Sequence, residues 1–104
     1  MEVLLIHRPR GLTPPELMKA NIQFGKELTE KPEKYAPGAK LVTSYTGCAQ
    51  MVIFCVWDAP KLESLMPLCG QMAIRGWDTE VIPVQNTKAA ILAMEKALAE
   101  MAKK

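Results

Sequence analysis

The sequence predicts an α+β protein with a ferredoxin-like βαββαβ core, a four-stranded antiparallel sheet and an extra C-terminal helix. Two observations predict this fold. Apolar runs of strand length alternate with segments of helical spacing in the order β-α-β-β-α-β-α, whose first six elements match the split βαβ arrangement. The first and third strands are the most apolar, and a proline lies within the fourth. The spatial order 4-1-3-2 places the apolar strands in the centre and the proline strand at an edge.

The chain begins with a strand and a helix. Residues 3–7 form a short, largely apolar run that is followed by Arg-Pro-Arg-Gly and is typical of a buried strand. Thr13 and Glu16 then predict a capping box, with Pro14 in the first helical position. Apolar side chains at helical spacing predict one buried helix face, which consists of Leu17, Ala20, Phe24 and Leu28.

Two strands joined by a hairpin follow the proline-containing segment 31–34, which ends this helix. Residues 40–46 and residues 51–57 are the predicted strands, with Gly47 in the turn between them. Seven consecutive apolar residues at 51–57 are typical of the middle of a sheet that is covered on both faces.

The second half of the chain repeats the alternation. Asp58 is the predicted cap of the second helix, and Pro67 predicts a break near Met66 because proline lacks the backbone donor that a helix interior requires. Residues 77–84 are the predicted fourth strand. A last helix begins at Asn86 and presents apolar side chains on one face, at Ile91, Met94, Leu98 and Met101.

The central strands are apolar on both of their faces, although the two helices of such a unit cover only one face of the sheet. A large exposed apolar patch is unusual on a soluble monomer. The last helix could fold over the open face, or a second copy of the chain could pack against it, sheet on sheet, with the last helix bracing the pair. We favour the second copy, and therefore predict a homodimer or a higher homo-oligomer.

Several short stretches resemble one known group of proteins. They are the element order, Gly47 followed by the strand to Trp57, the Leu-Met-Pro-Leu stretch at 65–68, and the ending at 79–84. Together they resemble the dimeric α+β barrel superfamily, and within it the muconolactone isomerase-like proteins, over roughly residues 3–84. The resemblance implies a barrel made of two packed sheets, with a small cavity beside each sheet. Because the group includes lactone isomerases, cofactor-free monooxygenases and haem-binding proteins, it implies no single reaction.

Composition argues against several classes of function. A net charge of +2 gives no electrostatic reason to expect nucleic acid. The apolar run near the N-terminus is far shorter than the ~20 residues of a membrane span, so no membrane partner is expected. The absence of a signal-peptide pattern and of C-x-x-C pairs predicts a cytoplasmic protein with free thiols. A single histidine, without a cluster of metal-ligating side chains, predicts neither a metal nor a cofactor.

Two residues are candidates for catalysis. His7 is the candidate acid or base because an unperturbed histidine titrates near neutrality. It ends the first strand, where a cavity between sheet and helix would open. Tyr45 is a candidate hydrogen-bond donor to a carbonyl or lactone oxygen. A two-residue turn in the hairpin would place Tyr45 on the side of Phe54, and a three-residue turn would place it on the side of Cys55; the sequence leaves both open.

Three further residues are candidates for ligand binding. Arg8 is suited to a carboxylate, and Trp57 and Cys55 would line a pocket for a flat apolar molecule. The sequence thus predicts a single domain over residues 1–104 that binds, and isomerises or oxidises, a small apolar organic molecule without a cofactor. The alternative is a non-catalytic module that uses its open sheet face only for self-association and has no cavity.

Overall fold

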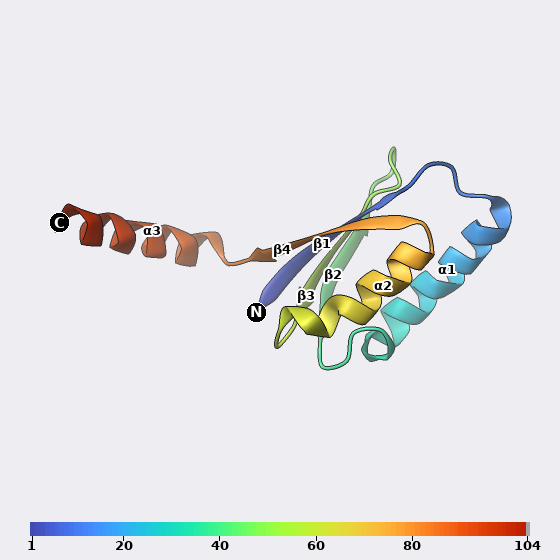
Figure 1. Ribbon diagram of the computed structural model, residues 1–104, viewed down its shortest axis with the longest axis horizontal. Coiled ribbons are helices and arrows are strands. Elements are labelled where there is room, and N and C mark those ends of the chain that lie inside the picture. The colour runs from blue at the N-terminus through green and yellow to red at the C-terminus, as the bar shows by residue number, and fades with distance from the viewer. Residues whose placement is uncertain (104) are drawn as a thin grey trace.

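The computed structural model describes residues 1–103 and confirms the predicted α+β, ferredoxin-like architecture (Figure 1). Its strands and helices follow the predicted order, and two short 3-10 helices precede or follow α-helices. The elements are β1 (Glu2–Pro9), α1 (Pro15–Glu30), η1 (Pro32–Lys34), β2 (Lys40–Thr46), β3 (Ile53–Asp58), η2 (Leu62–Leu65), α2 (Met66–Ile74), β4 (Trp77–Val84) and α3 (Thr87–Ala102).

The four strands form one antiparallel sheet in the order β2-β3-β1-β4. The apolar strands β1 and β3 are therefore central, as predicted. Pro83 lies in the edge strand β4, where its missing N–H interrupts no inner ladder. The other edge strand, β2, carries a bulge between Leu41 and Thr43. Both edges of the sheet are thus irregular.

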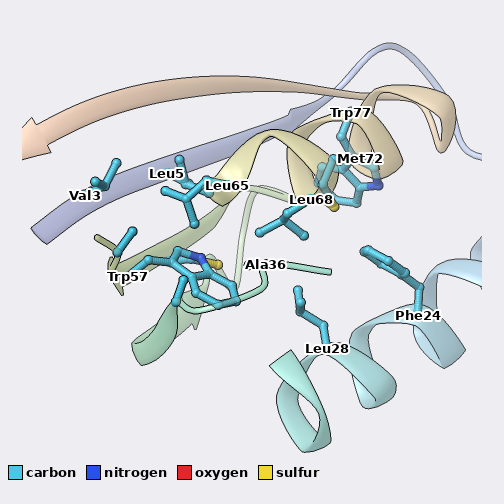
Figure 2. Close-up of a cluster of buried hydrophobic side chains, with 13 residues drawn as sticks. Val3, Leu5, Phe24, Leu28, Ala36, Trp57, Leu65, Leu68, Met72 and Trp77 are labelled. Carbon is cyan, nitrogen blue, oxygen red and sulfur yellow. The ribbon is translucent and has the colours of Figure 1, made fainter. Parts of the chain in front are cut away.

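Helices α1 and α2 cover the same face of the sheet (Figure 1), and the core fills the space between them and the strands (Figure 2). Alternate residues of the central strands point into this core, among them Val3, Leu5 and Cys55. Trp57 is fully buried and lies beside Ala36 and Leu65 in Figure 2. This inner face carries the buried half of each central strand.

The opposite face of the sheet is left open by the two helices. Its central side chains are apolar and only partly covered, and they include Leu4, Ile6, Phe54, Val56 and Ile82. Helix α3 does not fold over this face: it continues from the end of β4 away from the sheet (Figure 1), and none of its residues from 87 to 102 is buried. The first of the two predicted ways of covering the open face is therefore not realised within one chain.

Two of the predicted helix starts are wrong. The capping box at Thr13 and Glu16 is wrong, because extended Pro14 occupies the N-cap position and Pro15 begins α1, with no side-chain cap bond. The cap at Asp58 is also wrong, because Asp58 ends β3 and its carboxylate accepts from the Met1 amino group at 3.4 Å.

The two other helix signals are confirmed. The break predicted near Met66 is present, because η2 ends at Leu65 and α2 begins at Met66, with Pro67 in its first turn. Asn86 caps α3, and its side-chain oxygen accepts hydrogen bonds from the backbone N–H groups of Lys88 and Ala89.

Candidate functional site

A cavity of about 160 Å³ lies between the inner face of the sheet and the helices α1 and α2. All four strands and both helices contribute to its wall, so the ferredoxin-like core itself creates it. Its exposed members, Thr29, Ser44 and Thr46, mark the side on which it opens. The wall consists of His7, Asn21, Phe24, Gly25, Leu28, Thr29, Leu41, Ser44, Thr46, Ile53, Cys55, Met72 and Trp77.

The wall of the cavity is mainly apolar. Phe24, Met72 and Trp77 are buried members of the hydrophobic core and lie close together in Figure 2. Within residues 1–103, the lining includes no lysine, arginine, aspartate or glutamate. An ionic ligand would therefore lose its hydration without gaining a counter-charge in the wall.

His7 is a titratable residue of this wall, and it is 1% exposed. Its Nδ1 atom lies 2.8 Å from Oγ1 of Thr79, the residue opposite it on β4. Its Nε2 atom is buried and has no hydrogen-bond partner among the described residues. Burial lowers the pKa of His7 from 6.5 to about 4, because a low-dielectric surrounding disfavours the charged ring. At neutral pH the imidazole is therefore uncharged.

Asn21 is a second polar group with an unused atom in the wall. Its Oδ1 atom is buried and lacks a hydrogen-bond partner in the part of the chain that the structure describes. Asn21 follows Leu17 by four residues and precedes Phe24 by three, so it belongs to the buried stripe of α1. Helical spacing predicted Ala20 as a member of this stripe, but Ala20 is exposed. An asparagine at helical spacing from buried apolar residues was the signal that could have identified it.

Cys55 also lines the cavity, on the same inner face of the sheet as His7. Its Sγ atom lies 3.4 Å from Oγ of Ser44. Burial raises the pKa of the Cys55 thiol, so it is protonated at neutral pH and poorly suited to act as a nucleophile. Cys55 can therefore contact a ligand but does not supply a reactive thiolate.

Tyr45 and Arg8 lie on the open face of the sheet, away from the cavity. Tyr45 is 69% exposed and pairs with Phe54 across β2 and β3. It thus shares the face that the two-residue turn implied, although the connection between the strands is longer than either turn considered. Arg8 forms an ion pair with Glu80 on the neighbouring strand. Neither side chain joins His7 within one chain.

Trp57 is a core residue and is not part of the cavity lining among the described residues. It packs at the other end of the inner face, near Ala36 and Leu65 (Figure 2). Trp77 instead provides the indole of the cavity wall. Of the five site residues predicted from the sequence, the structure brings His7 and Cys55 together and places Arg8, Tyr45 and Trp57 elsewhere.

No model of a protein family matches this chain, and no curated protein gives a significant match to it. Over residues 1–103, no group of three or more His, Cys, Asp or Glu side chains is placed to hold a metal ion. Over the same residues, no helix has the length and apolar character needed to cross a membrane.

Proposed function

We propose that this chain binds a small, mainly apolar organic molecule in the cavity beneath α1 and α2. The observation that carries the proposal is His7, a fully buried side chain with an unpartnered ring nitrogen in a mainly apolar wall. A buried polar atom without a partner is costly, and ligand pockets combine an apolar wall with a few such atoms.

The size of the cavity limits the ligand. An apolar cavity of about 150 Å³ in another protein accommodates benzene. The volume of about 160 Å³ found here therefore corresponds to one six-membered ring with small substituents. Phe24 and Trp77 in the wall offer aromatic surfaces against which such a ring can pack.

The state of His7 favours binding over strong acid–base catalysis. A general base works best when its pKa lies near the working pH, and burial holds the pKa of His7 at about 4. If the chain isomerises or oxidises its ligand, His7 is the residue that accepts or returns the proton. Tyr45 would then take no part in the chemistry of its own chain, because it lies on the other face of the sheet.

Two glycines in helix interiors provide a matched test of the binding site. Gly25 of α1 lines the cavity, whereas Gly70 of α2 is outside its lining, and a Cβ atom at either position meets nothing within 4 Å. We expect toluene or phenol to change the fluorescence of wild-type Trp77 and to raise the melting temperature. Gly25→Met should weaken this binding at least tenfold by filling the cavity, and Gly70→Met should leave it unchanged. Failure of both compounds to bind the wild-type protein would overturn the proposal.

Self-association through the open sheet face is a second function supported by a separate observation. The sheet face and the apolar stripe of α3 (Ile91, Met94, Leu98 and Met101) are both without a partner in the described chain. The stripe has the 3-4-3 spacing of helices that pack against one another. We propose that a second copy of this chain covers both surfaces.

The available area agrees with a dimer. A four-stranded sheet with strands of this length spans about 450 Å² in projection, as calculated from the strand spacing and rise per residue. One side of a 16-residue helix adds about 250 Å². Together they approach the ~800 Å² that each partner contributes to a standard interface.

Two substitutions in α3 distinguish a packed stripe from a solvated helix. Leu98→Glu places a charge in the stripe, and Ala93→Glu places the same charge about a third of a turn away from it. We expect sedimentation to show a dimer for the wild-type protein and Ala93→Glu, and a shift towards monomer for Leu98→Glu. A wild-type protein that stays monomeric at micromolar concentration would contradict self-association.

A further inference from the structure

Two side chains of the cavity wall carry buried polar atoms whose hydrogen-bonding requirements together define the ligand more closely. They are Nε2 of His7 and Oδ1 of Asn21, both buried and both without a hydrogen-bond partner among residues 1–103. Both residues line the same cavity. A ligand that leaves either atom unpaired would forgo a buried hydrogen bond, which is costly to lose.

Oδ1 of Asn21 is an acceptor only, so its partner has to be a donor. The ring of His7 offers either kind of contact at Nε2. If the Thr79 hydroxyl donates to Nδ1, Nε2 carries the proton and donates; if the hydroxyl accepts from Nδ1–H, Nε2 accepts. The ligand therefore needs a donor for Asn21 and, when the Thr79 hydroxyl donates to Nδ1, an acceptor for the Nε2–H of His7.

The lack of charged side chains in the described part of the cavity wall restricts the class of ligand further. A carboxylate offers acceptors only, which repel Oδ1 of Asn21, and the wall contains no cation to neutralise it among the described residues. An ammonium group would find no anion in the same wall. A ketone or an ether is neutral but has no hydrogen to give to Asn21. A hydroxyl group is neutral, donates once and accepts through its oxygen lone pairs.

We propose that the natural ligand is a neutral hydroxyl compound, such as a phenol or a cyclic alcohol, whose OH group donates to Asn21 Oδ1 and accepts from His7 Nε2–H, with the Thr79 hydroxyl donating to Nδ1. This inference rests on the proposed binding function and specifies its ligand class. The ring of the ligand lies against the apolar wall, where Phe24 and Trp77 are placed to contact it. The site thus discriminates by hydrogen bonding at one end of the ligand and by apolar packing at the other.

Three probes of similar size separate this ligand class from the alternatives. Phenol carries the hydroxyl group, toluene replaces it with a methyl group, and benzoate replaces it with an anion. We expect phenol to bind about tenfold more tightly than toluene, which corresponds to about one buried hydrogen bond, and benzoate to bind most weakly. Isothermal titration calorimetry with the full chain measures all three.

Two variants of α1 test the role of Asn21 directly. Asn21→Leu removes the unpartnered oxygen and keeps a good helix former of similar size, so the helix should persist. Gln23→Leu makes the same kind of change at an exposed position of the same helix, outside the cavity lining. We expect the preference for phenol over toluene to fall severalfold in Asn21→Leu and to stay unchanged in Gln23→Leu.

The single histidine of the chain provides a readout that does not depend on affinity. Binding of phenol should move the ¹⁵N resonance of His7 Nε2 more than that of Nδ1, because Nδ1 already has the Thr79 hydroxyl as its partner. Equal affinities for phenol and toluene, or an unmoved Nε2 resonance, would overturn the hydroxyl assignment while leaving the cavity a binding site. Failure of every probe to bind would instead remove the binding function itself.

Discussion

The hydroxyl group of Thr79 lies 2.8 Å from Nδ1 of His7, across the pairing of β1 with β4. One ring nitrogen of a fully buried histidine thus has a partner within the protein, and the other does not. The neighbouring strand therefore decides which nitrogen is left for a ligand.

Replacing Thr79 with valine should remove the hydrogen-bond partner of His7 Nδ1. Thr79→Val keeps the shape of the side chain but leaves Nδ1 buried without a partner, so we expect the free energy of unfolding to fall by about 1–3 kcal/mol. Urea denaturation measures the change. Thr79→Ser retains the hydroxyl group and should preserve most of the stability and the ¹⁵N shift of Nδ1. Equal stabilities of the wild-type protein and Thr79→Val would show that the bond contributes nothing.

The lowered pKa of His7 predicts a loss of stability in mild acid. Above pH 6.5 the ring is neutral in the folded and the unfolded chain, so it contributes no pH dependence. Between pH 6.5 and about 4 the unfolded chain binds a proton that the folded protein excludes. The free energy of unfolding should therefore fall with pH over this window, by about 3 kcal/mol in total.

A His7→Gln variant isolates this contribution. The pKa of the Glu27 carboxyl is also lowered, chiefly by the hydrogen bond from Tyr35. Protonation of Glu27 therefore destabilises the fold at lower pH in both proteins. The difference between the wild-type protein and His7→Gln should be constant above pH 7 and should change only as the pH falls from 6.5 towards 4. Parallel curves over that window would show that His7 titrates normally.

Replacing either helical glycine with alanine should stabilise the fold, whereas only the glycine that lines the cavity should affect binding. Gly25→Ala and Gly70→Ala each remove the backbone freedom of glycine from a helix interior and meet no atom within 4 Å. We expect each variant to raise the free energy of unfolding by about 0.5–1 kcal/mol. Gly25→Ala should also weaken toluene binding slightly, because its methyl group enters the wall of the cavity. A loss of stability in either variant would contradict the open space around that glycine.

The strand order could be predicted from the sequence because two independent signals agreed. The apolar runs of β1 and β3 required central positions, and Pro83 required an edge. Helix starts were harder to predict. Thr13 was predicted as a cap because two prolines and Glu16 follow it, but Pro14 occupies the cap position. Asp58 instead remains in β3, where its backbone pairs with Glu2 and its carboxylate with the N-terminal amino group.

The candidate site was less predictable than the fold. Strand alternation places His7 on the face of Val3 and Leu5, but because both faces of this strand are apolar it does not show which face the helices cover. The face of Tyr45 depended on the length of a connection that no pattern specified, and Asn21 was missed because only apolar residues were counted along α1. The unpaired state of two atoms is a property of packing in three dimensions, and no spacing along the chain records it.

The irregular edges of the sheet bear on how copies of this chain can meet. β4 offers no N–H at Pro83, and β2 is distorted by the bulge between Leu41 and Thr43. An incoming strand would find a broken ladder on either side, which discourages open-ended growth into fibrils. A second copy that packs on the open apolar face of the sheet needs no free strand edge. Once one copy covers that face, no further copy can bind there. The fold thus permits a closed pair and resists an endless array.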